Sequence, residues 1–202
     1  MTRGAPRLPP SDLAERQLPT TRAGGVYYRC APSSQPPLHW QAHSDTRFSD
    51  AFHPTLYLAD SKLTGFWECF GDGLNDQAQD QKALPLHLLS VRHWVRFTID
   101  PPLRVLDVTD PEALRAIGAD GGTFLADYSI TRRWSQALAS HSAQIDGLRY
   151  RSRLDSKHFC IAVWGRPALV RAAKRFRAIG ESALLKDTEF LLFLAERDIA
   201  LL

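Results

Sequence analysis

Strand signals that do not alternate regularly with helices are the feature that most restricts the fold of this chain. Runs rich in β-branched and aromatic residues, bounded by glycine, proline or aspartate, predict strands at 26–30, 55–59, 93–99, 103–108, 147–153 (running into a polar turn) and 159–164. Asp100-Pro101-Pro102 predicts a tight turn between antiparallel neighbours. The pattern favours an α+β protein, with a mixed, mainly antiparallel sheet and flanking helices, over a parallel doubly wound sheet.

The helix expected after the strand at 55–59 directs a glutamate away from the core. Asp60 or Ser61 can cap its first turn, because a side-chain oxygen there accepts hydrogen bonds from free backbone N–H groups. Four apolar side chains then share one face at helical spacing, namely Leu63, Phe66, Trp67 and Phe70. Glu68 lies on roughly the opposite side, so we expect it to meet water or to line a cleft.

Other helical signals are spread along the chain. The run Thr109-Asp110-Pro111-Glu112 offers a cap, a proline in the first turn and an acid near the positive helix end, and the helix should stop at Gly118. A longer helix is expected over 131–145, with His141 as a hydrogen-bonded residue rather than a metal ligand. Residues 166–179 predict an amphipathic helix with a solvated basic face, and a nucleic-acid surface there is the less favoured interpretation.

The length of 202 residues fits one domain with a full hydrophobic core. Residues 1–25, rich in proline and arginine, are expected to form an extended N-terminal arm, and residues 26–202 a single domain whose last part, 166–202, is a helical extension. The segment 189–202 is strongly apolar and fits either a helix or a strand. It is expected to pack on the body or on a partner.

The composition bears on the cellular compartment of the protein and on the partners it can bind. A net charge of +3 is too small to argue for nucleic acid by itself. Three widely spaced cysteines without a C-x-x-C pair predict reduced thiols in the cytoplasm, and no apolar run approaches the ~20 residues of a membrane span. His39 and His43 follow two prolines and lack an evident third ligand, so no metal is expected.

Three polar side chains within residues 46–68 can converge on one small site. Arg47 lies on an expected loop, Tyr57 on a short strand and Glu68 on the following helix. The sequence lacks the common nucleotide-binding and hydrolase motifs, such as the P-loop, G-x-G-x-x-G and G-x-S-x-G. Taken singly, each of the three side chains is more often a surface charge or a core-edge residue.

The order of several short motifs resembles the RES domain family. These motifs are Tyr28-Arg29, Thr46-Arg47-Phe48, Leu56-Tyr57-Leu58-Ala59, Glu68 and Asp146-Gly147-Leu148-Arg149-Tyr150-Arg151-Ser152-Arg153, and the resemblance covers about residues 25–165. It implies a fold similar to that of ADP-ribosyltransferase toxins, with residues 26–202 as the catalytic domain. Members of the family consume NAD, and several are the toxin of a toxin–antitoxin pair.

The resemblance also implies roles for individual residues. Glu68, Arg47 and Tyr57 are expected to be catalytic, while NAD is expected to be bound by Arg29, Tyr28 and Ser152. The implied reaction breaks the nicotinamide–ribose bond of NAD, as a glycohydrolase or phosphorylase, in a toxin neutralised by an antitoxin. A homo-oligomer is a further expectation.

Two alternatives stay open at this point. One is an ADP-ribosyltransferase that modifies a macromolecule. The other is a non-catalytic module that binds an anion or a protein, and it is motivated by Asp45-Thr46, which stand where the family usually has a glycine pair before the arginine. Release of nicotinamide from NAD distinguishes an enzyme from a binding module.

Overall fold

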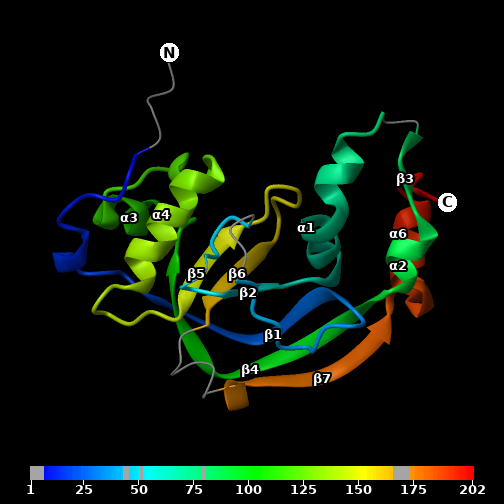
Figure 1. Cartoon of the computed structure of the whole chain (residues 1–202), viewed down its shortest axis with the longest axis horizontal. Helices are drawn as coiled ribbons and strands as arrows, with labels where there is room; N and C mark the ends of the chain where they lie inside the picture. The colour runs from blue at the N-terminus through cyan, green and yellow to red at the C-terminus, as the bar shows by residue number, and fades with distance from the viewer. Residues whose placement is uncertain (1–6, 43–45, 51, 79–80, 166–172) are drawn as a thin grey trace.

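Six strands pair into a sheet that closes on itself in the computed structural model of this chain, which describes residues 7–42, 46–50, 52–78, 81–165 and 173–202 (Figure 1). The strands follow one another in the order β1-β2-β6-β5-β4-β7, and β1 also pairs with β4. Their bounds are β1 Thr21–Pro32, β2 Thr55–Ala59, β4 Arg92–Asp107, β5 Gly147–Arg151, β6 Phe159–Trp164 and β7 Phe176–Ala183.

The sheet consists of two antiparallel halves with narrow junctions. One half contains β7, β4 and β1, and the other contains β2, β6 and β5. A single antiparallel pair, Tyr28 with Ala59, joins β1 to β2, and three parallel pairs join β4 to β5. The expectation of a mixed, mainly antiparallel sheet is confirmed, but the sequence pattern does not predict that the sheet closes into a barrel.

The prediction of a tight turn at Asp100-Pro101-Pro102 is wrong. These residues lie inside β4, whose pairing with β1 extends from Pro32–Arg92 to Thr21–Val105 on both sides of them. The register shifts at Gly24, where a Cβ would lie 2.8 Å from the Pro102 ring. The missing glycine side chain therefore leaves room for the proline, so the two strands stay paired across an irregularity.

Helices cover the sheet at its two ends (Figure 1). The described residues contain five α-helices and a second, parallel two-stranded sheet. These elements are α1 Lys62–Asn75, α2 Leu86–Ser90, α3 Pro111–Ile117, α4 Tyr128–Ala139, α6 Thr188–Ala195, β3 Ala83–Leu84 and β8 Ala200–Leu201. One buried cluster lies under α3 and α4, and another joins α1 to α6.

The predicted helix starts are largely confirmed, because they depend on local hydrogen bonds. The Ser61 side chain accepts from the N–H of Thr64 and caps α1, and Asp110 caps α3, which ends at Gly118 with a φ of 82°. In contrast, α4 ends before His141. This buried histidine lies in the following turn, where its ring nitrogens contact the Leu13 carbonyl and the Ala143 N–H.

The prediction of a helix over 166–179 is wrong for its described part. Residues 166–172 lie outside the described residues, Ala173–Arg175 form a single 3₁₀ turn, and Phe176 begins β7. Phe176 is buried, and β7 pairs with β4, so the backbone groups of this segment find partners on an otherwise open strand edge. The extension expected as helical thus contributes a strand to the main sheet.

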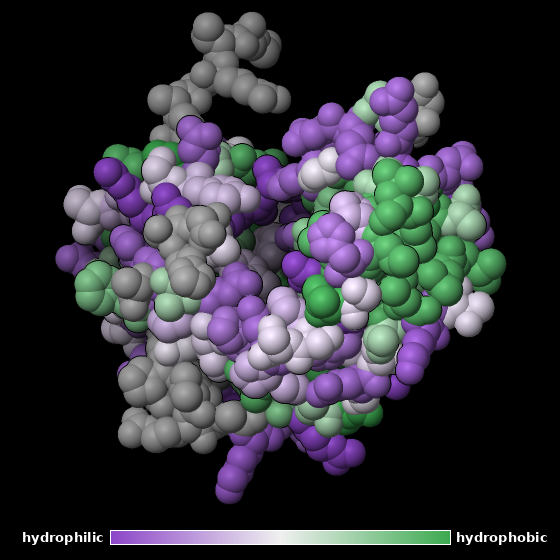
Figure 2. Space-filling model, turned by 45° about the vertical axis from the view of Figure 1, so that its right-hand side comes forward, coloured by the Kyte–Doolittle hydropathy of each residue, from purple (hydrophilic) through white to green (hydrophobic). Residues whose placement is uncertain are grey.

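Both ends of the chain pack on the body. Leu13 and Leu18 are buried, Trp134 donates to the Arg7 carbonyl across 2.7 Å, and residues 21–25 of the expected arm already belong to β1. At the other end, residues 189–202 contain both α6 and β8. Figure 2 shows apolar surface gathered on one side, and the exposed apolar side chains of α2, α6 and β8 include Leu88, Leu192 and Leu201. Among the described helices, none is long and apolar enough to cross a membrane.

Candidate active site

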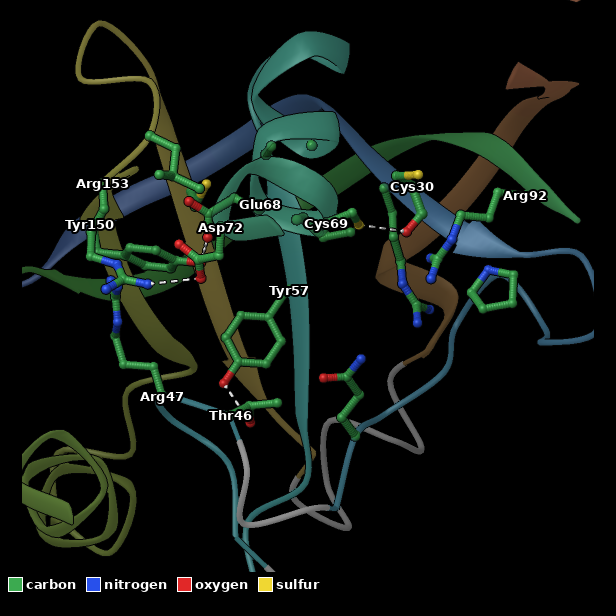
Figure 3. Close-up of a pocket in the computed structure, with 18 of the residues that line it drawn as sticks. Cys30, Thr46, Arg47, Tyr57, Glu68, Cys69, Asp72, Arg92, Tyr150 and Arg153 are labelled. Atoms are coloured by element: carbon green, nitrogen blue, oxygen red, sulfur yellow. Dashed lines mark hydrogen bonds and ion pairs between the residues drawn. The ribbon is translucent and has the colours of Figure 1, made fainter. Parts of the chain in front are cut away.

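A cavity of about 360 Å³ lies beside α1 and contains most of the side chains singled out from the sequence (Figure 3). It is lined by four arginines and two carboxylates, which are Arg29, Arg47, Arg92, Arg153, Glu68 and Asp72. Tyr57 and Tyr150 add aromatic surface. Arginines and carboxylates that line one cavity suit a ligand that carries both phosphates and a centre of developing positive charge.

The carboxylate of Glu68 is held at both oxygens. Ser152 donates to Oε1 across 2.7 Å, and Tyr150 donates to Oε2 across a longer 3.4 Å. The Ser152 hydroxyl oxygen accepts the backbone N–H groups of Leu154 and Asp155, so its hydrogen is left for Glu68. A glutamate on a helix is thereby fixed by residues at the end of β5.

Ser152 contributes through Glu68 rather than from the wall of this cavity. It is 2% exposed, and it lines a neighbouring cleft of about 740 Å³ that also includes Arg47, Tyr150 and Arg153. Because its hydrogen-bonding groups already have protein partners, a direct bond to the ligand, as expected from the sequence, would require one of them to break. We therefore assign Ser152 a positioning role.

The loop that carries Arg47 is held by two side chains of α4. Thr131 of α4 donates to the Arg47 carbonyl at 2.9 Å, and Ser135 donates to the Phe48 carbonyl at 2.6 Å. The guanidinium carbon of Arg47 lies 5.7 Å from the ring centroids of both Phe48 and Tyr150, which gives cation–π contacts. The side chain is 8% exposed, so little of its conformational freedom remains to be lost on binding.

Thr46 is the described member of the residue pair that stands where the RES pattern usually has two glycines. Among the described residues, non-glycine residues with positive φ are Gln144 and Asp198, so Thr46 has ordinary backbone geometry. Asp45, the other half of the departure, lies outside the described residues. Hydrogen bonds to the carbonyls of Arg47 and Phe48 thus fix the loop without left-handed backbone at Thr46.

Tyr57 places its ring in the cavity, while its hydroxyl is engaged by the same loop. The hydroxyl accepts the Phe48 N–H at 2.9 Å and donates to Thr46 Oγ1 at 3.2 Å. Burial raises the pKa of Tyr57 above its usual value, which keeps the phenol protonated at neutral pH. These contacts favour a ring-stacking role for Tyr57, because its hydroxyl already has two partners within the protein.

Arg29 lies at the far end of the cavity, and part of its hydrogen-bonding capacity is used within the protein. It donates to the Pro37 carbonyl at 2.9 Å and to Gln35 Oε1 at 3.1 Å. Burial lowers the pKa of the Arg29 guanidinium relative to its usual value, although a reference value near 12.5 keeps arginine cationic in proteins. Tyr28 does not join this group, since it lines another hollow with Asp60 and Lys62.

The cavity residues missed from the sequence include Tyr150, Arg92, Arg153 and Asp72. Tyr150 stands in the motif that carries Ser152, and its position two residues before Ser152 was the available signal. Burial raises its pKa well above the usual value, so its hydroxyl keeps a hydrogen to donate. Arg153 pairs with Asp72, one turn beyond Glu68 on α1, at 3.3 Å. Arg92 begins β4, and local sequence gives no sign that it faces this cavity.

The described residues contain no group of three or more histidine, cysteine, aspartate or glutamate side chains placed to hold a metal ion.

Comparison with known proteins gives two positive findings. The model of a family described as the RES domain matches residues 21–184. A crystal structure of the M. tuberculosis MbcT–MbcA toxin–antitoxin complex contains a similar chain, with 17% sequence identity, a TM-score of 0.64, and coverage of 87% of this chain and 93% of that chain. At this identity the likeness shows a shared fold. No curated protein matches the sequence.

Proposed function

Because this chain belongs to the RES domain family, we propose that it is an enzyme that breaks the nicotinamide–ribose bond of NAD in the cavity beside α1. The observation that carries this proposal is the double hold on Glu68, whose carboxylate oxygens are bonded to Ser152 and Tyr150 within an arginine-lined cavity. A fixed carboxylate is what an oxocarbenium-like transition state requires.

The charge distribution matches the two parts of the reaction. Nicotinamide leaves as a neutral group from a cationic bond, so its departure needs no general acid, while positive charge develops on the ribose. Glu68 stabilises that charge and accepts hydrogen bonds from the ribose hydroxyls. It keeps its orientation while the bond breaks, because Ser152 and Tyr150 already hold it.

The arginines bind the pyrophosphate in this proposal. Arg47 is the strongest candidate, since it is nearly buried and its ring contacts with Phe48 and Tyr150 fix its plane. A planar guanidinium makes paired, charge-assisted hydrogen bonds to phosphate oxygens. The ring of Tyr57 supplies a stacking surface for the nicotinamide or adenine ring.

Nicotinamide release from NAD by the purified protein tests the activity. We expect the wild type to release nicotinamide, and Glu68→Gln, which is nearly the same size but neutral, to lose about 100-fold or more of kcat. Equal release by both proteins would place the chemistry elsewhere. No release by the wild type, with water, phosphate or a macromolecular acceptor present, would favour the binding-module alternative.

The products identify the acceptor. Free ADP-ribose indicates a glycohydrolase, ADP-ribose 1″-phosphate formed only with added phosphate indicates a phosphorylase, and label retained on a macromolecule indicates a transferase. We propose water or phosphate, because the described cavity is small and lined by charges that fit NAD itself.

We also propose that the protein acts as a toxin restrained by an antitoxin. The support is the family together with the fold shared with a chain of the MbcT–MbcA toxin–antitoxin complex. Expression of the wild type in bacteria should deplete NAD and stop growth, and Glu68→Gln should do neither. Growth arrest by both proteins without NAD loss would contradict the proposal.

A further inference from the structure

Two cysteines meet at the wall of the cavity, next to the glutamate proposed to act on NAD. Cys69 follows Glu68 on α1, and Cys30 lies on β1 (Figure 3). The Cys69 thiol donates to the Cys30 carbonyl oxygen at 3.4 Å, and the two thiols are close enough for each to shift the pKa of the other. Both residues line the cavity.

The pair is chemically asymmetric. Cys69 is exposed and Cys30 is buried. The hydrogen bond from the Cys30 thiol is the largest influence and lowers the pKa of Cys69 below its usual value. Burial acts in the opposite direction, and the positive charges of Arg92 and Arg29 add to the lowering. The same hydrogen bond, together with burial, raises the pKa of Cys30. Cys69 is thus the accessible thiol with more thiolate character, and Cys30 is a protonated thiol in contact with it.

Cys160 provides an internal contrast. It is also a free cysteine that lines the cavity, but it is 1% exposed and lies in the apolar core. Burial raises its pKa well above the usual value. Oxidation requires an accessible thiolate, so Cys160 should be inert where Cys69 reacts.

We propose that Cys69 and Cys30 are a redox-active pair that a peroxide converts to a disulfide at the wall of the cavity. The adjacent thiols need only a closing movement to reach the S–S bond length of about 2.05 Å. This modification site rests on the 3.4 Å contact of the Cys69 thiol with the Cys30 backbone and on the place of both residues in the cavity wall, and the pKa asymmetry supports it. Its effect on catalysis rests on the proposed NAD-cleaving function.

The reaction proceeds in two steps with hydrogen peroxide as oxidant. The Cys69 thiolate attacks one peroxide oxygen, the O–O bond breaks, and the hydroxide that leaves takes up the proton lost from Cys69 to become water. Cys69 is then a sulfenic acid. The Cys30 sulfur attacks the Cys69 sulfur, the S–O bond breaks, and hydroxide leaves with the Cys30 proton as a second water. The two thiols lose two electrons, and the peroxide gains them.

The disulfide would disturb Glu68 because Cys69 is its neighbour on the helix. Closure of the S–S bond draws this turn of α1 toward β1, while Ser152 and Tyr150 hold the carboxylate from β5 and its following turn. A displacement near 1 Å in such a site can cost about 100-fold in rate. Oxidation should therefore lower the turnover of NAD.

Peptide mapping of the full-length protein tests the site without any measurement of activity. The reduced protein is treated with hydrogen peroxide, unfolded, alkylated with iodoacetamide and digested. We expect a peptide that links Cys30 to Cys69, reversal of that link by dithiothreitol, and loss of the Cys69 thiol at least about tenfold faster than that of Cys160. Cys160→Ser should keep the link, and Cys69→Ser should leave Cys30 alkylated. Absence of the link in oxidised wild type, or oxidation of Cys160 at the same rate, would overturn the proposal.

Activity of the same samples tests the consequence. Oxidised wild type should release nicotinamide about tenfold or more slowly than reduced wild type, with recovery after dithiothreitol. Peroxide should change the turnover of Cys69→Ser by less than about twofold relative to its own reduced sample. A link that forms without a change in turnover would refute control of the site. If reduced wild type shows no turnover, the proposed function fails, and the peptide map alone decides on the thiol pair.

Discussion

Ser152 donates its hydroxyl hydrogen to Oε1 of Glu68 across 2.7 Å, and the two residues are 84 positions apart in the sequence. The serine is fixed in turn by the N–H groups of Leu154 and Asp155. The glutamate is therefore oriented by the turn that follows β5, while its own helix α1 supplies only its position.

Ser152→Ala should lower kcat about 10- to 100-fold with little change in the KM for NAD. The substitution removes the hydroxyl that donates to Glu68 Oε1 and positions the carboxylate. It does not alter the arginine side chains that are proposed to bind the pyrophosphate. Steady-state kinetics measure the split, and Ser156→Ala in the same turn is the matched control, since its side chain is exposed. A variant with normal kcat and a raised KM would instead mean that Ser152 binds the substrate.

Tyr150→Phe should have a smaller effect, with kcat reduced about two- to fivefold. The hydroxyl lies 3.4 Å from Glu68 Oε2, which is a weak hydrogen bond, and the remaining ring still contacts Arg47 and Phe48. The kcat of Tyr150→Phe is measured by steady-state kinetics and compared with the kcat of Ser152→Ala. If the phenylalanine variant is the more damaged of the two, the assignment of the stronger hold to Ser152 is wrong.

Arg47→Lys should raise the KM for NAD about tenfold or more. Lysine keeps the positive charge but loses the planar fork and the ring contacts with Phe48 and Tyr150. Isothermal titration with NAD on the Glu68→Gln background separates binding from turnover. Arg177→Lys, at an exposed position on β7, is the control for an exchange of arginine for lysine. Equal affinities of the two lysine variants for NAD would exclude Arg47 from the binding site.

Gly147→Ala should destabilise the fold by about 3 kcal/mol or more, a size reached when a buried backbone contact is forced apart. A Cβ at Gly147 would overlap the Ala162 carbonyl oxygen and lie 2.9 Å from Cα of Val163, so β5 and β6 would have to separate. Urea denaturation measures the loss. Gly180→Ala on β7 is the control, because its Cβ would have no atom within 4 Å, and the two variants should differ clearly.

Asp50→Asn should cost about 1 kcal/mol of stability at neutral pH, and less as the pH falls. Burial by itself would raise the pKa of Asp50, but hydrogen bonds from the backbone N–H groups of His53 and Phe52 outweigh it, so the net pKa is lowered. The contribution is complete above the unfolded-state value of about 3.9 and disappears as the pH falls through the lower folded-state pKa. Urea denaturation between pH 7 and pH 3 should show the gap closing, and a constant gap would contradict this account.

The parts of the site that the sequence predicts are those that depend on near neighbours. The caps at Ser61 and Asp110 and the orientation of Glu68 away from the apolar face of α1 follow from spacing within one or two turns. The strand that carries Tyr57 was likewise evident from its own residues. Three of the expected polar residues, Arg29, Arg47 and Tyr57, line the same cavity as Glu68.

The errors occur where distant segments decide the outcome. The sequence Pro101-Pro102 is typical of a turn. In the structure, Gly24 of β1 leaves room for the Pro102 ring, so these prolines lie within β4. The basic segment before Phe176 has helical spacing in the sequence. The residues from Phe176 onward nevertheless form a strand, because they pair with the edge of β4. The contact of Tyr28 with NAD stays a prediction, and Tyr28 lines a hollow other than the cavity of Glu68.

The sequence by itself determined most of the strands, the caps of α1 and α3, and the apolar face of α1, because these properties depend on contacts between residues close in the chain. Only the tertiary structure decided that β1 closes the sheet against β4, that Ser152 and Tyr150 reach Glu68, and that Cys69 meets Cys30. Such pairings depend on the packing of whole elements against one another, and a local pattern carries no information about which partner an exposed strand edge or side chain will find.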